Sequence, residues 1–213
     1  MSKVDLSVLL IDDHEMVRSG CRRLLEQGGH TVVGEASSGE QGLELYRELT
    51  PDIVIVDLLL PGMSGLEITQ QILARDPKAS IVIFTVQNNV ALAERVMKLG
   101  ALGYVTKASD SSVLLNAVKQ VANHKEFLGP DIAQALALKQ IHQQDSSFAT
   151  LTTREFEVFQ LVAKGLGSPT ISETLHLSPK TVANHLYRIK QKLDVTTSAE
   201  MAHLAIRHGL LTP

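Results

Sequence analysis

Polar side chains follow several apolar runs in the first half of the sequence, at the point where each run ends. Asp12 and Asp13 follow the run VLLI, and Asp57 follows the β-branched run IVIV. Thr85 closes the run IVIF, and Lys107 comes shortly after GYV. Three carboxylates, a hydroxyl and an ammonium are groups that together can bind a divalent ion and a phosphoryl group.

The three acids are expected to need a positive partner, because neighbouring carboxylates repel one another at neutral pH. Hard oxygen ligands suit Mg²⁺, which keeps some of its waters and shares a phosphate as a ligand. Lys107 and Thr85 would then cradle a phosphoryl group, and Asp57 would be the nucleophile that forms an aspartyl-phosphate. Any one of these residues could merely end its strand, but five complementary groups at strand ends are hard to assign to chance.

The chain up to residue 124 alternates short runs rich in Val and Ile with longer amphipathic segments. This alternation predicts right-handed βαβ units and a parallel sheet that is covered by helices on both faces. Continuously apolar strands are what burial on both faces requires. The segment is therefore expected to be a doubly wound α/β domain with five strands. The predicted strands are Ser7–Ile11, Thr31–Glu35, Ile53–Val56, Ile81–Thr85 and Gly103–Val105, and the predicted helices are 14–28, 39–49, 64–75, 89–99 and 110–124.

Ligands bind beyond the carboxyl ends of the strands in an open parallel sheet, at the switch point in strand order. If the strand order is 2-1-3-4-5, the strand before Asp12 lies beside the strand before Asp57. The carboxylates then converge at one edge of the sheet.

No strand pattern survives beyond residue 150, and signals for the starts of helices take its place. A capping box of Thr152 and Glu155 starts a helix that is expected to end near Lys164. A capping serine with a proline in the first turn starts each of the next two, at Ser168-Pro169 and Ser178-Pro179. A last helix is expected at about 197–207. The three-residue turn before Pro179 predicts a helix-turn-helix, whose second helix enters the major groove of DNA.

The helix over residues 179–193 has two distinct faces. An apolar stripe, which is expected to face the core, is formed by Val182, Leu186, Ile189 and Leu193. The opposite face can donate hydrogen bonds to phosphates and base edges, although such a face is often simply solvated. It carries Lys180, Asn184, Tyr187 and Gln191, with Arg188 and Ala183 on its flanks.

Composition excludes several classes of protein. A hydrophobic content of 44% is too high for disorder, and no apolar run approaches the ~18 residues of a membrane span. The N-terminal MSKVDLS carries no secretion signal, and the single cysteine, Cys21, suits the reducing cytoplasm. Residues 1–124 hold 15 acidic and 11 basic side chains, whereas residues 151–213 hold 5 acidic and 7 basic ones. This asymmetry favours a protein whose C-terminal part meets nucleic acid, and the cysteine content favours a cytoplasmic location.

The front half resembles the receiver domain of two-component response regulators. The resemblance covers residues 5–124 and is carried by the order and spacing of Asp12-Asp13, Asp57 with Pro61-Gly62 behind it, Thr85 and Lys107. It implies a flavodoxin-like fold with the strand order 2-1-3-4-5.

The resemblance also implies a role for each matched residue. Asp57 is the implied phosphoacceptor, and Mg²⁺ is the implied cofactor. The implied ligands of the ion are Asp13, Asp57 and the backbone carbonyl of Leu59, with Asp12 acting through water. Thr85 and Lys107 would bind phosphoryl oxygens, and Tyr104 falls where the family has an aromatic switch residue.

The back half resembles the LuxR-type helix-turn-helix that follows receivers of the NarL/FixJ family. The segment ISETLHLSPKTVANHLYRIKQKL carries this resemblance, and PDIAQALALK and HLAIRHGL look most like the Gac/Uvr-type global activators. The implied DNA-contacting residues are Lys180, Thr181, Asn184, His185, Tyr187, Arg188 and Lys192. The implied organisation is a receiver over 1–124, a linker with a partial helix over 125–148, and a smaller all-α helix-turn-helix domain over 149–213.

The leading hypothesis is therefore a phosphorylation-controlled transcription regulator and not an enzyme. A sensor histidine kinase or a phosphotransfer domain would phosphorylate Asp57, which would release the helix-turn-helix to bind double-stranded DNA as a homodimer. One alternative is a phosphohydrolase, but such enzymes commonly place a second acid two residues after the nucleophile, where this chain has Leu59. Another is a passive dimerisation module, which would have no use for mutually repulsive carboxylates.

Overall fold

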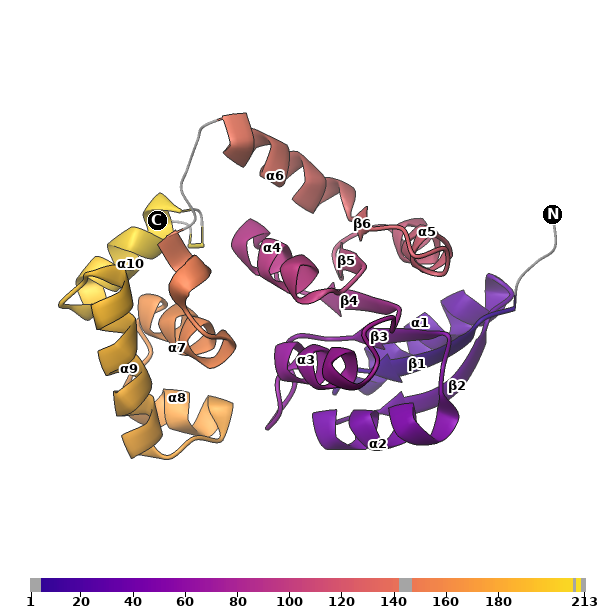
Figure 1. Cartoon of the computed structure of the whole chain (residues 1–213), viewed down its shortest axis with the longest axis horizontal. Coiled ribbons are helices and arrows are strands. Elements are labelled where there is room, and N and C mark those ends of the chain that lie inside the picture. The colour runs from indigo at the N-terminus through magenta and orange to yellow at the C-terminus, as the bar shows by residue number, and fades with distance from the viewer. Residues whose placement is uncertain (1–4, 142–146, 209, 212–213) are drawn as a thin grey trace. The chain divides into compact units, whose positions relative to one another are not determined.

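The computed structural model describes residues 5–141, 147–208 and 210–211, and the chain divides into two compact units (Figure 1). The first unit is Met1–Leu138 and the second is Lys139–Pro213. The division that the sequence predicts at residues 124 and 148 stays a prediction.

A parallel sheet forms the centre of the first unit. Its order is β2-β1-β3-β4-β5-β6, so the predicted order of the first five strands is confirmed. The prediction of five strands is wrong, because a sixth strand of two residues pairs with β5 at the edge. A strand this short has no periodicity of its own, and pairing with its neighbour defines it. The strands are β1 (Ser7–Ile11), β2 (Thr31–Ala36), β3 (Ile53–Val56), β4 (Ile81–Thr85), β5 (Gly103–Thr106) and β6 (Phe127–Leu128).

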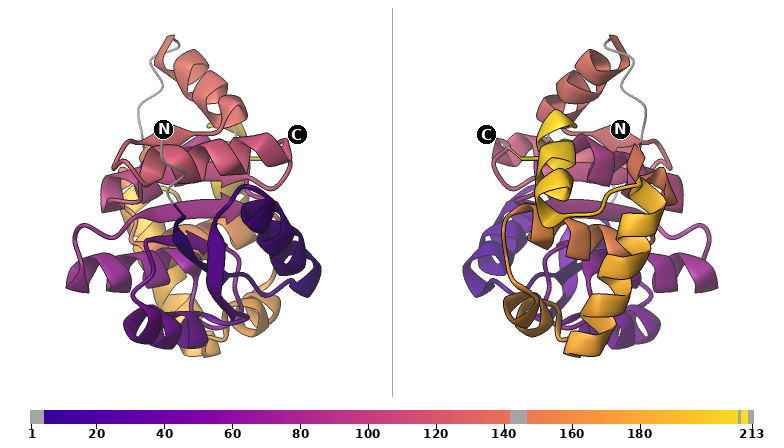
Figure 2. Two further views of the ribbon diagram at one scale, coloured as in Figure 1. Left: turned by 90° about the vertical axis from the view of Figure 1, so that its right-hand side faces the viewer. Right: turned by 90° about the vertical axis from the view of Figure 1, so that its left-hand side faces the viewer.

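Helices cover both faces of this sheet. Helices α1 and α5 pack together on one face, whereas α2, α3 and α4 follow one another across the other (Figures 1 and 2). Strands β1, β3, β4 and β5 are almost fully buried between these layers, as their continuous apolar sequence predicts, whereas the edge strands β2 and β6 are partly exposed. The helices are α1 (Glu15–Gln27), α2 (Gly39–Leu49), α3 (Gly65–Arg75), α4 (Val90–Leu99), α5 (Ser111–Val121) and α6 (Pro130–Ile141).

Short helices make up the second unit, and most of their starts follow the predicted caps. Thr152 and Glu155 form the capping box of α7, and the Ser178 side chain accepts a hydrogen bond from an amide in the first turn of α9. The prediction that Ser168 caps its helix is wrong, because Gly167 occupies the cap and Ser168 is the first helical residue. The elements are η1 (Ser147–Thr150), α7 (Thr153–Ala163), α8 (Ser168–Leu175), α9 (Pro179–Leu193) and α10 (Ser198–Arg207).

The core of the second unit forms where α7, α9 and α10 pack together. Phe156 and Phe159 of α7 are almost fully buried, as are Val182 and Ile189 of the predicted apolar stripe. Leu186 and Leu193 are half-buried, so the stripe does face the core. Within the part of the chain that the structure describes, every helix is too short or too polar to cross a membrane.

Candidate functional site

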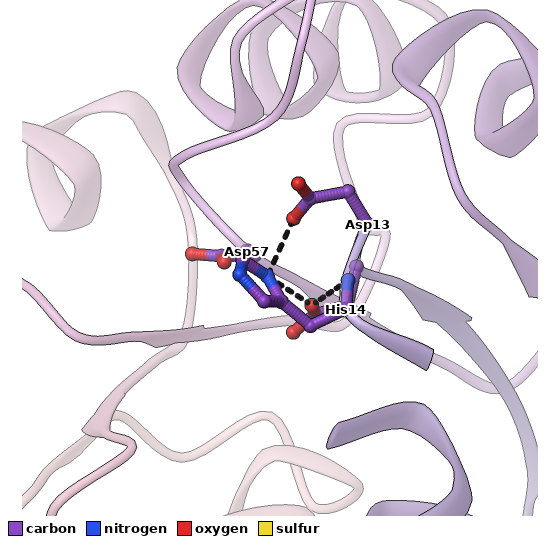
Figure 3. Close-up of side chains that lie close together, drawn as sticks. Asp13, His14 and Asp57 are labelled. Carbon is purple, nitrogen blue, oxygen red and sulfur yellow. Dashed lines mark hydrogen bonds and ion pairs between the residues drawn. The ribbon is translucent and has the colours of Figure 1, made fainter. Parts of the chain in front are cut away.

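The acids that follow β1 and β3 lie together at the carboxyl edge of the sheet. Because these strands are hydrogen-bonded neighbours, the Asp57 amide donates to the Ile11 carbonyl at 2.8 Å. Ligand atoms of Asp12, Asp13, His14 and Asp57 all lie within 4.8 Å of one another (Figure 3). Asp12 is 5% exposed and Asp57 is 2% exposed. The structure thus brings together the three carboxylates that the sequence predicts for this site.

Lys107 places its ammonium between two of these acids. Its Nζ lies 2.6 Å from Oδ2 of Asp12 and 2.6 Å from Oδ2 of Asp57. Burial alone would lower the pKa of this ammonium, but its hydrogen bonds to the two carboxylates outweigh burial and raise the pKa. The lysine therefore stays charged and neutralises part of the acidic cluster.

His14 belongs to this site as well, and the sequence argument missed it. Its Nδ1 lies 2.8 Å from Oδ1 of Asp13, a contact that is dashed in Figure 3, and 3.5 Å from Oδ1 of Asp12. Its backbone amide also donates to Oδ1 of Asp12 at 2.9 Å. The feature of the sequence that could have identified His14 is its position directly after the acidic pair Asp12-Asp13.

Thr85 is the last residue of β4, and Tyr104 lies within the neighbouring strand β5. Both are fully buried, and the Thr85 hydroxyl accepts from the Gln87 amide at 3.4 Å. The Tyr104 hydroxyl donates to the Gln87 carbonyl at 2.7 Å, so both side chains contact the same loop residue. The Lys107 amide donates to the Thr85 carbonyl at 2.7 Å, which fixes the lysine beside the threonine.

The peptide of Asp57 is held by the start of α3. A side chain at Gly65 would place its Cβ 2.0 Å from the Asp57 carbonyl oxygen, so only glycine fits there. The sequence argument singled out Gly62 and missed this glycine. Leu59, which is 48% exposed, donates its amide to Oδ1 of Asp57 at 3.2 Å.

The carboxylates of Asp12, Asp13 and Asp57 form a set that could hold a metal. Their oxygens are hard ligands, converge within a few ångströms and come from a rigid sheet edge, which suits a divalent cation such as Mg²⁺. His14 offers a nitrogen, which is a less suitable ligand for such an ion.

The second unit presents a helix-turn-helix with the predicted three-residue turn, between the end of α8 at Leu175 and the start of α9 at Pro179. Four of the predicted DNA-contacting residues are exposed on the face of α9 opposite the core, and Tyr187 is 67% exposed. These residues are Lys180, Asn184, Tyr187 and Arg188.

The other three predicted DNA-contacting residues are bound to the protein itself or half-buried. The Lys192 ammonium donates to Oε2 of the buried Glu155 at 2.6 Å, and the Thr181 hydroxyl lies 2.8 Å from that of Ser178. His185 is half-buried, and its Nδ1 is fully buried and meets no partner among the described residues. Burial lowers the pKa of this imidazole. Lys192 is thus exposed like the first four residues but has its ammonium bonded within the protein, whereas Thr181 and His185 are half-buried.

Comparison with known proteins assigns both units to families. Residues 8–119 match the response regulator receiver domain, and residues 149–205 match the bacterial regulatory proteins of the luxR family. The response regulator GacA of Pseudomonas aeruginosa is 42% identical over 209 residues, which cover 97% of this chain and 98% of GacA. UvrY of Escherichia coli K12 is 41% identical over 208 residues, which cover 96% of this chain and 95% of UvrY.

Solved structures of related regulators share the fold of the whole chain. RcsB of Salmonella enterica serovar Typhimurium, bound to a promoter in the presence of a phosphomimetic, matches with 26% identity and a TM-score of 0.69. The match covers 94% of this chain and 97% of that one. A structure of two RcsB dimers on two parallel DNAs matches with 27% identity, a TM-score of 0.62 and the same coverage of both chains.

These relatives are DNA-binding response regulators, which are transcription factors and not enzymes. The receiver-like strand order, the helix-turn-helix and the near full-length identity to GacA and UvrY agree with one another. The chain therefore belongs to the NarL/FixJ family of two-component response regulators and is of the Gac/Uvr type.

Proposed function

We propose that Asp57 accepts a phosphoryl group and that this reaction controls DNA binding by the second unit. The observation that carries the proposal is the convergence of Asp12, Asp13, Asp57 and the Lys107 ammonium at the carboxyl edge of the sheet, where Asp12 and Asp57 are buried. The same chain presents an exposed polar face on the second helix of a helix-turn-helix. Both parts of a phosphorylation-dependent regulator are thus present.

The chemical step is nucleophilic attack by the Asp57 carboxylate on phosphorus. An oxygen of Asp57 forms the new P–O bond, while the P–N bond to the donor's phosphohistidine breaks and the imidazole nitrogen keeps the electron pair. The Lys107 ammonium and the Thr85 hydroxyl bind the phosphoryl oxygens, where negative charge is spread in the transition state. Since β3, β4 and β5 fix the positions of Asp57, Thr85 and Lys107, little reorganisation is needed during transfer.

Asp13, Asp57 and the Leu59 carbonyl would hold Mg²⁺, with Asp12 acting through water. The ion supplies positive charge that allows an anionic acid to react with an anionic donor. His14 lies against the Asp13 carboxylate and holds its orientation.

Thr85 and Tyr104 form the proposed switch. The added phosphoryl charge draws the Thr85 hydroxyl away from the amide of Gln87. Tyr104 is bonded to the carbonyl of that same residue, so the loop after β4 transmits the change. Such a charge-driven shift between two conformations is how phosphorylation generally acts.

The phosphodonor is a sensor histidine kinase or a phosphotransfer domain, and the output is binding to double-stranded DNA. Lys180 and Arg188 contact phosphates, and Asn184 and Tyr187 face the base edges. Thr181, His185 and Lys192 lie near the DNA on the same helix, and they act by fixing the position of α9. Phosphorylation favours a homodimer, in which each copy reads one half-site. Because chromosomal DNA is the proposed target, we expect the protein to act in the cytoplasm.

The deciding experiment labels the full chain with phosphoramidate and Mg²⁺ and then measures its affinity for genomic DNA fragments. The wild type should gain phosphate and bind DNA more tightly, whereas Asp57→Asn should gain neither. Asp52→Asn is the matched control. Asp52 is an exposed aspartate that directly precedes β3, whereas Asp57 directly follows it. Equal DNA affinity of the wild type and Asp57→Asn, with and without the donor, would make the receiver a passive module.

A further inference from the structure

Among the described side chains of helix α6, full burial is confined to its first turn. Of its side chains that the structure describes, residues 130–138, only Ile132 is buried. The helix then runs away from the sheet beyond the edge strand β6 (Figures 1 and 2). The amide of Gly129, directly before α6, donates to the Tyr104 carbonyl at 2.8 Å. A small number of contacts at its first turn therefore fixes the direction of α6.

One of these contacts joins α6 to the end of β5. The Thr106 hydroxyl donates to Oδ2 of Asp131 at 2.8 Å, and Thr106 is 1% exposed. Since that hydroxyl has one proton, the Ser109 hydroxyl, 3.0 Å away, must donate to it in turn. The Ser109 amide also donates to the Thr106 carbonyl at 3.0 Å. Thr106 and Ser109 thus close the turn that carries Lys107.

Thr106 is connected to both groups that would bind phosphoryl oxygens. It is the residue before Lys107, and it pairs with Thr85 across the ladder between β4 and β5. Phosphorylation turns the Asp57 carboxylate into an acyl phosphate, so the Lys107 ammonium must exchange a carboxylate contact for a phosphoryl oxygen. A shift of Thr85 or Lys107 toward the phosphoryl group must therefore act on the backbone of Thr106.

Asp131 is poised to respond to such a shift. Its Oδ1 is buried and meets no partner among the described residues, so the single bond from Thr106 holds the carboxylate. A Cβ at Gly129 would lie 2.9 Å from this oxygen, which leaves the carboxylate little room on that side. Burial raises the pKa of Tyr104, and the charges of Asp57 and Asp131 raise it further, so both acids act on the same tyrosine. Tyr104 thus lies near both Asp57 and Asp131, on the strand that also carries Thr106.

We propose that Asp131 is a positioning residue that couples the phosphorylation site to helix α6 through the hydroxyl of Thr106. The inference rests on the proposed phosphorylation of Asp57. Phosphorylation moves the end of β5, changes the bond between Thr106 and Asp131, and so changes how firmly the first turn of α6 is held. Since α6 leads from the receiver toward the second unit along the chain, it is the element through which such a change leaves the receiver. Such coupling requires an element that has two states and whose equilibrium depends on the phosphorylation site, and the first turn of α6 is the proposed element.

The test compares hydrogen exchange of the amides of residues 132–138 before and after full-length protein is labelled with phosphoramidate and Mg²⁺. In the wild type these amides should change their exchange rate severalfold on labelling. Thr106→Ser keeps the hydroxyl and should preserve this response. Thr106→Val has nearly the same shape without the hydroxyl, and Asp131→Ala lacks the acceptor, so both should lose the response. Asp131→Ala leaves the residues around Lys107 unchanged and should still be labelled at Asp57 within about twofold of the wild-type rate.

A merely structural role for the bond gives a different result. In that case Asp131→Ala would speed exchange in α6 equally in both states, and the difference on labelling would persist. That outcome would overturn the inference, as would a wild type that is labelled at Asp57 without any change in α6. A wild type that cannot be labelled would instead contradict the proposed function.

Discussion

At the scale of single residues, the partners of a charged side chain decide what it is available to do. Lys192 and Arg188 both lie on α9 and both fit the DNA-binding pattern of the family. Lys192, however, donates to the buried carboxylate of Glu155, whereas Arg188 is exposed on the outer face. The two residues should therefore respond differently to the same substitution.

Arg188→Ala and Lys180→Ala are each expected to weaken DNA binding and to lower the slope of log affinity against log salt by about 1, because each removes one phosphate contact. Lys192→Ala should mainly destabilise the second unit, by about 1–3 kcal/mol, because it leaves the buried Glu155 without its charged partner. Salt-dependent binding assays and chemical unfolding separate the two effects.

Lys119→Ala, at an exposed position on α5, is the matched control. An unchanged salt slope in both Arg188→Ala and Lys180→Ala would remove these residues from the interface.

At the scale of secondary-structure elements, the start of α7 links local capping to the packing of the second unit. Glu155 accepts from the Thr152 amide at 2.6 Å in the capping box and also receives the Lys192 ammonium from α9. One buried carboxylate therefore helps to cap the start of α7 and also joins this helix to α9. Caps of this kind typically contribute about 1 kcal/mol.

This arrangement predicts an acid-sensitive second unit. Burial alone would raise the pKa of Glu155, but the hydrogen bonds from Lys192 and Thr152 outweigh it and hold the pKa below its ordinary value of 4.5. A carboxyl with a lowered pKa stabilises the folded state above its unfolded-state pKa, and this stability is lost as pH falls through the folded-state value. Exchange protection of α7 and α9 amides should therefore fall as pH drops below about 4.5 in the wild type.

Glu155→Gln should show weaker protection at neutral pH and a shallower dependence on acid, because its side chain no longer loses a charge. Glu173→Gln, at an exposed position on α8, provides the comparison and should follow the wild type. If the Glu155→Gln profile matched the wild type across the acid range, the ion pair with Lys192 would carry no stability.

At the scale of the whole molecule, the chain joins an acidic receiver to a basic DNA-binding unit. The excess of basic over acidic side chains beyond residue 150 is small, so one copy offers few contacts to phosphates. Two copies double that number and allow a two-fold symmetric site to be read. Dimerisation on phosphorylation is therefore the expected way for this chain to reach useful affinity.

Light scattering of the full chain should accordingly show a doubling of molar mass when phosphoramidate and Mg²⁺ are added. Asp57→Asn should keep the mass of the unlabelled protein under the same conditions, and chelation of Mg²⁺ should prevent the doubling in the wild type. A labelled protein that remains monomeric at micromolar concentration, with and without DNA, would contradict this expectation.

Much of the receiver site could be predicted from the sequence, because each of its residues is positioned by the strand directly before it. A run of β-branched residues before Asp57 specifies a buried strand whatever its neighbours are, and the residue after it must lie at the carboxyl edge. The same reasoning holds for Thr85, and capping boxes such as that of Thr152 depend on residues three positions apart. Periodicity and capping act over a few residues, so the sequence by itself determined most of the elements, the acidic site and the two faces of α9.

Tertiary structure decided which polar groups meet across long stretches of chain. The bond between Thr106 and Asp131, the pair of Lys192 with Glu155, and the contact of Gly65 with the Asp57 carbonyl each depend on how separate elements pack. The two residues of β6 form a strand only because the edge of β5 is there to receive them. Such contacts are set by interatomic distances of about 3 Å between groups far apart in sequence, which no short-range pattern encodes.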